Sequence, residues 1–210
     1  MQPAEIAPGL FRWEAAHPEW KPKEDWPQMV GCVLYELQER SVLIDPLIPD
    51  DGREGLLAWL DGRLQGREVS ILTTIRWHRR DREELARRYV PGFRDDPTAP
   101  GSSRPWNEAP EGVGARWLKG AGEIVFWLPG AGALVPGDSL LGVGEGRLQV
   151  CPEGWLEDVE VDRRGLAALL AALLELPLER VLVSHGEPVL HDGRRALAQA
   201  VAEAEAAPPG

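Results

Sequence analysis

Polar residues stand at the ends of four segments that the sequence predicts to be buried strands. They are Asp45, the stretch 74–81, Asp138 and His185. Aspartate and histidine act as acids, bases and ligands, and the arginines within 74–81 carry guanidinium groups that suit carboxylates and phosphates. Because ligand sites in layered α/β folds gather where strands end and loops begin, we expect a binding or catalytic site among these four places.

The elements that must position these residues alternate between strands and helices. Strands are predicted at residues 9–13, 29–37, 41–46, 68–74, 115–119, 123–128, 133–135 and 180–184. Helices are predicted at residues 56–64, 81–89, 166–174 and 193–206. The three closely spaced strands between 115 and 135 are typical of an antiparallel meander. Such alternation favours an α/β layer structure.

The composition is that of an ordinary globular protein. Of the 210 residues, 43% are hydrophobic and 27% are charged, and nothing divides residues 1–210 into more than a single domain. A formal charge of −11 opposes nucleic-acid binding, because neutralising phosphates requires clustered lysines and arginines. The amino terminus lacks a signal-peptide pattern, so we expect a cytoplasmic protein. The longest apolar run, 166–176, is too short to span a membrane.

The segment 90–114 is rich in proline, glycine, aspartate and serine and predicts a long surface loop. Loops of this length are uncommon unless they are functional or disordered, so an interaction role for this loop is one hypothesis. Trp77, Trp106 and Trp155 come from segments that can rim a cleft, where they would favour an apolar or ring-bearing small molecule. We expect His17 at the surface.

Four segments, in chain order, resemble motifs of the metallo-β-lactamase superfamily. They are VLID at 42–45, ILTT at 71–74, LVPGD at 134–138 and VLVSHG at 181–186. Members of this superfamily end an early strand in Asp, carry HxHxDH after a Thr-terminated strand, and later show an isolated His, a Gly-Asp and a His-Gly. The resemblance implies an α/β fold in the form of a four-layer αββα sandwich, with a metal site at one edge between the two sheets.

The HxHxDH motif of the superfamily is degenerate in this chain. Counted from Thr74, the residues at its ligand positions are Ile75, Trp77, Arg79 and Arg80. None of these is a usual zinc ligand. A shift by a single residue brings in His78 and Asp81 but still places arginines where ligands belong. The isolated His is missing between Asp81 and Asp138, and the four histidines of the whole sequence are too few for the usual dinuclear centre.

The resemblance leaves His78, Asp138 and His185 as ligands of a mononuclear metal site. Three protein ligands and a water are a common way to hold catalytic zinc, which lowers the pKa of that water to about 7. Alternatively, Arg76 or Arg80 replaces the charge of the cation and pairs with Asp138, because a fixed guanidinium can hold neighbouring carboxylates. Such a pocket would also bind an anion.

Two further functional hypotheses, besides the interaction role of the 90–114 loop, concern this site. The first is a divergent metallo-β-lactamase-like protein with a degenerate metal site and no cofactor, which is non-catalytic or binds a small anionic ligand through Arg76, Arg80 and Asp81. The alternative is a mononuclear zinc hydrolase of an ester, thioester or phosphoester, with Asp45 or Asp81 near the attacking water. The fold alone does not decide between them, because one fold hosts many functions.

Overall fold

The first half of the chain forms a five-stranded sheet in the order β1-β2-β3-β4-β5. The computed structural model describes residues 2–93, 108–156 and 159–207. The strands of this sheet are β1 (Ala4–Ala7), β2 (Leu10–Ala16), β3 (Met29–Glu36), β4 (Arg40–Ile44) and β5 (Glu68–Leu72). Helix α1 (Arg53–Leu64) joins β4 to the parallel strand β5, and α2 (Arg82–Tyr89) follows β5. Leu56, Leu60 and Leu64 recur at helical spacing in α1, so all three are buried on one face.

The second half forms a four-stranded sheet, ordered β11-β8-β7-β6, and a two-stranded ribbon. The sheet contains β6 (Gly114–Leu118), β7 (Glu123–Leu128), β8 (Ala133–Val135) and β11 (Arg180–Val181), and the ribbon pairs β9 (Leu140–Gly142) with β10 (Leu148–Val150). The helices of this half are α3 (Arg163–Ala171), α4 (Gly193–Ala206), and the 3₁₀ helices η2 (Pro129–Ala131), η3 (Glu153–Leu156) and η4 (Ala172–Glu175). Helix α3 begins after Asp162, whose carboxylate accepts a hydrogen bond from the N–H of Gly165 at 2.7 Å.

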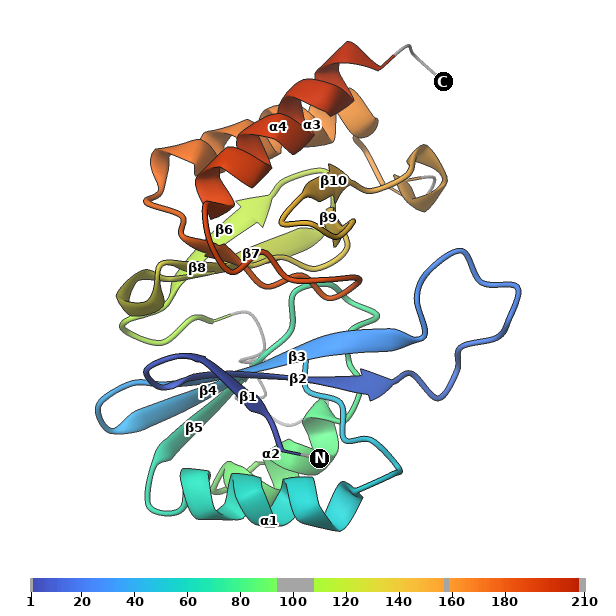
Figure 1. Ribbon diagram of the computed structural model, residues 1–210. Coiled ribbons are helices and arrows are strands. Elements are labelled where there is room, and N and C mark those ends of the chain that lie inside the picture. Colours follow the sequence, from blue (N-terminus) through green and yellow to red (C-terminus); the bar gives the residue numbers. More distant parts are fainter. Residues whose placement is uncertain (1, 94–107, 157–158, 208–210) are drawn as a thin grey trace.

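The two sheets lie face to face, with α1 and α2 outside the first sheet and α3 and α4 outside the second (Figure 1). Side chains of β3 alternate between these layers, as the period of a strand requires. Cys32 and Leu34 pack with α1, whereas Val33 and Tyr35 pack with Phe126 of β7 between the sheets. The predicted four-layer αββα sandwich is therefore confirmed. No helix in the described ranges is long and apolar enough to cross a membrane.

Most predicted elements are present, and they differ from the structure mainly at their ends. The helix predicted at 193–206 has those bounds, and the helix predicted at 166–174 starts at Arg163 and ends in η4. Strands β1, β9 and β10 were not predicted, because each is only three or four residues long and lacks a full alternating pattern. The predicted loop 90–114 has no helix or strand in its described parts before Gly114, where β6 begins, and its residues 94–107 lie outside the described ranges.

Candidate metal centre

Three side chains from separate loops meet at the edge between the sheets. His78 lies between β5 and α2, Asp138 follows β8, and His185 follows β11. Nε2 of His78 lies 3.0 Å from Oδ1 of Asp138, and Nε2 of His185 lies 3.3 Å from the same oxygen. The potential ligand atoms of these three residues, called here the His–Asp–His set, all lie within 4.8 Å of one another. The structure thus brings together the three residues that the resemblance left as ligands.

The Oδ1 atom of Asp138 is buried between the Nε2 atoms of two imidazoles, and no other hydrogen-bond donor among the described residues reaches it. Either a protonated His78 donates to this oxygen, or a cation lies between the three side chains and replaces that proton. Atoms that surround zinc tetrahedrally at about 2.0 to 2.2 Å lie roughly 3.3 Å apart, close to the two distances given above. Two histidines and a carboxylate also form a known catalytic zinc ligand set. The donors therefore fit a single divalent cation.

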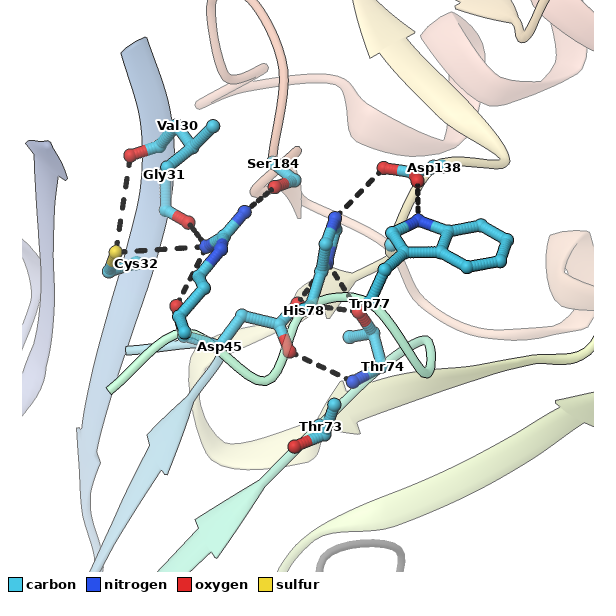
Figure 2. Close-up of polar contacts among 12 residues, drawn as sticks. Val30, Gly31, Cys32, Asp45, Thr73, Thr74, Trp77, His78, Asp138 and Ser184 are labelled. Atoms are coloured by element: carbon cyan, nitrogen blue, oxygen red, sulfur yellow. Dashed lines mark hydrogen bonds and ion pairs between the residues drawn. The ribbon is translucent and has the colours of Figure 1, made fainter. Parts of the chain in front are cut away.

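Asp45 contacts the Nδ1 side of the His78 ring (Figure 2). Oδ2 of Asp45 lies 2.9 Å from Nδ1 of His78 and accepts a hydrogen bond from the Thr74 hydroxyl at 2.5 Å. With Nδ1 protonated toward Asp45, Nε2 of His78 keeps its lone pair for a ligand, as in many metal-binding histidines. The structure therefore places Asp45 behind His78, and not near an attacking water as the hydrolase hypothesis expected.

The charges of His78 and Asp138 depend on each other. Burial disfavours the imidazolium, but the carboxylates of Asp138 and Asp45 outweigh this effect and raise the pKa of His78 to about 9. Burial also disfavours the Asp138 carboxylate, but His78 and His185 hold its pKa well below its usual range. Without a metal, His78 is therefore an imidazolium between two carboxylates at neutral pH. Zinc binds only the neutral ring, so it would replace this proton.

Glu123, at the start of β7, positions the loop that carries Asp138. Its carboxylate is 1% exposed and accepts hydrogen bonds from the backbone N–H groups of Gly137, Asp138 and Ser139 and from the Ser139 hydroxyl, at 2.6 to 3.0 Å. Gly137 has no room for a side chain, because a Cβ there would lie 2.8 Å from the hydroxyl oxygen of Thr74. The role of Glu123 was not predicted, and its one signal in the sequence is a single acid at the start of an otherwise apolar strand.

Close backbone contacts hold His185 between the two halves of the molecule. The N–H of Gly31 in β3 donates to the carbonyl of Ser184 at 2.7 Å, and the N–H of Gly142 in β9 donates to the carbonyl of His185 at 2.9 Å. A Cβ on Gly186 would lie 2.0 Å from the carbonyl oxygen of Gly142, and the φ of Gly186 is +83°. These bonds explain why the strand predicted at 180–184 pairs as a strand only at 180–181.

The guanidinium of Arg80 binds protein groups outside the His–Asp–His set. It donates to the carbonyl of Gly31 at 2.9 Å, to the carbonyl of Asp45 at 2.7 Å and to the Ser184 hydroxyl at 2.6 Å. Arg80 has a φ of 43°, in the left-handed region that residues other than glycine rarely adopt. Together with a longer hydrogen bond to Sγ of Cys32 at 3.8 Å, these contacts offset the backbone strain and join β3, the end of β4 and the loop after β11.

The other predicted ligand-binding residues do not join Arg80 in the site. Arg76 is exposed, with its guanidinium 5.1 Å from the ring centre of Trp77. Asp81 accepts a hydrogen bond at 2.6 Å from a backbone N–H after β4, and it does not line the cavity. The expected pairing of Arg76 or Arg80 with Asp138 is wrong, because Asp138 contacts His185 and, as Figure 2 shows, also contacts His78 and accepts the indole N–H of Trp77 at 2.5 Å.

A cavity of about 350 Å³ opens onto the His–Asp–His set. Trp77 and Trp155 line it as expected, together with Trp26, and the predicted contributor Trp106 lies outside the described residues. His17, expected at the surface, is half-buried and also lines the cavity. The roles of Trp26 and His17 were not predicted, because the stretch between β2 and β3 shows no helix or strand period.

The chain is similar to solved structures of metallo-β-lactamases. One from Hirschia baltica is 17% identical, aligns over 97% of this chain and 97% of its own, and has a TM-score of 0.58. The chain has the metallo-β-lactamase fold. Further metallo-β-lactamases come from Erythrobacter litoralis, at 16% identity with 97% and 95% of the chains aligned and a TM-score of 0.57, and from Pontibacter korlensis, at 15% identity with 98% and 99% aligned and a TM-score of 0.55.

No protein-family model and no curated protein sequence matches the chain. At the identities of the solved structures, the metallo-β-lactamase likeness shows the fold alone. One fold supports many activities, so a function for this chain has to be argued from its own site.

Proposed function

We propose that this chain is a mononuclear hydrolase that binds one zinc ion, or a similar divalent cation, through the His–Asp–His set and cleaves a small ester or thioester. The observation that carries the proposal is the convergence of two imidazole Nε2 atoms on the buried Oδ1 atom of Asp138, at 3.0 and 3.3 Å, with the three potential ligand atoms within 4.8 Å of one another. Two histidines and one carboxylate are a ligand set found in catalytic zinc sites. Bound zinc supplies a Lewis acid and a water whose pKa is lowered to about 7.

The surrounding residues prepare this site for a ligand. Asp45 keeps the proton of His78 on Nδ1, and Glu123 holds the loop of Asp138 through backbone hydrogen bonds. Both supporting carboxylates are nearly buried, so water does not compete for their hydrogen bonds. Tryptophan rings line the cavity beside the His–Asp–His set, and such apolar walls strengthen electrostatic interactions next to them.

His17 is the candidate proton carrier of the cavity. The backbone N–H of Glu19 donates to Nδ1 of His17 at 3.3 Å, so the ring proton of the neutral form is on Nε2. Burial and the positive charge of Arg80 lower the pKa of His17, which keeps the ring neutral at physiological pH. A neutral imidazole can accept a proton from a nucleophile and deliver it to a leaving group.

Hydrolysis of 4-nitrophenyl acetate and of an aryl thioester tests the proposal. We compare zinc-loaded wild type, chelator-treated wild type and the variants His185→Ala and His17→Gln. His191→Ala is the matched control, because His191 is 81% exposed and lies outside the cavity. We expect chelation and His185→Ala to reduce the rate at least about 100-fold, and His17→Gln to reduce kcat about 10- to 100-fold with zinc retained. Equal rates before and after chelation would contradict the proposal.

A second candidate is a metal-free, non-catalytic binding pocket. It is favoured by the position of His78 between Asp45 and Asp138, whose carboxylates raise the pKa of its imidazole to about 9. In this candidate, the imidazolium takes the place of a cation and holds both carboxylates. A folded wild-type protein that binds no zinc would favour it over the hydrolase.

A further inference from the structure

Aromatic rings form the walls of the cavity on two sides of His185. Trp26 comes from the connection between β2 and β3, and Trp155 comes from η3 in the other half of the chain. Their ring centres lie 5.5 and 5.7 Å from that of His185, both in edge-to-face geometry. Trp77 lines the cavity next to Asp138. A ligand at the His–Asp–His set is therefore surrounded by indole rings.

The polar ends of two of these rings are already engaged by the protein. Trp77 donates its indole N–H to Asp138, and Trp155 donates its indole N–H to Asp25 at 2.8 Å. An indole whose N–H is bonded offers a ligand only its ring. Such rings bind other rings by stacking and bind cations through the negative face of the π-system. The walls therefore favour a ring-bearing or cationic group over a group that needs many hydrogen bonds.

The charged groups that line the cavity differ in depth. His78 and Asp138 lie next to each other in the His–Asp–His set, and burial raises the pKa of Glu123 to about 7. Arg80 is the one arginine among the lining residues that the structure describes, and both of its terminal nitrogens already donate to protein acceptors. The exposed acids of the cavity are Glu19 and Asp25, whose carboxylates would face a ligand whether or not a divalent cation is bound.

We propose that the cavity selects substrates whose ring-bearing part is uncharged or cationic, and that it rejects anionic substrates, including phosphoesters. This inference rests on the proposed function and narrows its substrate class to carboxylic esters and thioesters. The cavity volume of about 350 Å³ suits one ring with small substituents. In the reaction, water adds to the acyl carbon and the C–O or C–S bond breaks. The products are a carboxylic acid and an alcohol or thiol, so water is the only co-reactant.

Equilibrium binding of three probes tests this selectivity apart from hydrolysis. Benzyltrimethylammonium, benzyl alcohol and benzenesulfonate share a phenyl ring, differ in charge and are poor zinc ligands. Calorimetric titration into the purified wild-type protein, with and without added zinc, gives their Kd values. We expect the cation to bind most tightly and the sulfonate most weakly, with the cation at least about tenfold tighter than the sulfonate.

Single variants place the probes in the cavity. Trp155→Ala is expected to raise the Kd values of benzyltrimethylammonium and benzyl alcohol about five- to tenfold. Trp117→Ala is the matched control and should change neither, because Trp117 is 59% exposed on β6 and does not line the cavity. Asp25→Asn should weaken binding of the cation about threefold and leave binding of the alcohol unchanged, since it removes one exposed charge.

Two results would overturn the inference: a sulfonate that binds as tightly as the cation, or the absence of measurable binding by all three probes. If the probes bind as expected but no ester is cleaved, the proposed hydrolase function is contradicted, whereas the preference for uncharged or cationic rings is supported. Faster cleavage of 4-nitrophenyl phosphate than of 4-nitrophenyl acetate would support a hydrolase and overturn the ligand class. The two proposals can therefore fail separately.

Discussion

Two charged groups lie partly buried at the edge between the sheets, and they differ in the groups that surround them. The terminal nitrogens of Arg80 donate to two backbone carbonyls, to the Ser184 hydroxyl and to the sulfur of Cys32, and only its Nε lacks a partner. Oδ1 of Asp138 instead faces the Nε2 atoms of two imidazoles, both of which can bind a metal in their neutral form. A charge that binds backbone carbonyls holds the fold, whereas a carboxylate that faces potential metal ligands indicates a site for a cation.

The largest expected effect is the loss of zinc binding in Asp138→Asn. This change removes a charged ligand, so we expect the zinc affinity to fall about 10³-fold. Loss of a residue that only hydrogen-bonds to a metal ligand typically lowers the affinity roughly 10- to 100-fold. Competition titration against a chromogenic chelator measures it. Asp192→Asn is the control, because Asp192 is exposed before α4. Unchanged affinity in Asp138→Asn would show that Asp138 is not a ligand.

Substitution of Arg80 should lower the stability of the protein and leave its zinc affinity nearly unchanged. Arg80→Ala leaves three acceptors without their donor and keeps the strained backbone, so we expect the free energy of unfolding to fall by about 3 kcal/mol. The zinc affinity of the folded variant should stay within about threefold of wild type, because Arg80 contacts no atom of the His–Asp–His set. Urea denaturation of the metal-free proteins measures the stability, with the exposed Arg79→Ala as control. A stable Arg80→Ala variant that loses zinc would show that Arg80 supports the metal site and not the fold.

The pH dependence should separate the metal-free and zinc-bound states. The folded pKa of His78 is raised from 6.5 to about 9, so its contribution to stability is fully present below pH 6.5 and is lost as the pH rises through 9. We expect metal-free wild type to lose about 2 to 3 kcal/mol over this window relative to His78→Asn. The apparent zinc affinity should rise with pH, because zinc competes with the proton on His78. A zinc affinity that does not change with pH would contradict a role for His78 as ligand.

The smallest expected effect belongs to Asp45→Asn. The neutral amide keeps the shape of the carboxylate but weakens the charged contact with Nδ1 of His78, so the zinc affinity should fall about tenfold. Isothermal titration with zinc measures it, and Asp51→Asn is the control, because Asp51 is exposed outside the cavity. A loss as large as that of Asp138→Asn would mean that Asp45 itself binds the metal.

Local patterns predicted the fold well. The alanine-rich run gave the bounds of α4, and the leucines at helical spacing in α1 identified its buried face. Local patterns failed where long-range contacts decide the structure. The segment after Val181 has the apolar composition of a strand, but its backbone bonds to Gly31 and Gly142 of other strands and so forms a bridge between the two halves.

The candidate site was predicted only in part. His78, Asp138 and His185 followed from the motifs, because residues at strand ends meet at one edge of a layered fold. The role of Arg80 did not follow, since its acceptors are backbone carbonyls 49 and 35 residues away in the chain. Glu123 and Trp26 were missed for a similar reason: their partners come from distant loops, and no spacing in the sequence reports such contacts.

Elemental analysis shows whether the His–Asp–His set of this protein holds a metal. Wild type, Asp138→Asn and His185→Ala are expressed in zinc-supplemented medium, purified and measured. We expect about one equivalent of zinc in wild type, as in a mononuclear site, and its loss in both variants. Folded wild-type protein that carries no zinc and takes up none on titration would show that the His–Asp–His set is not a zinc site.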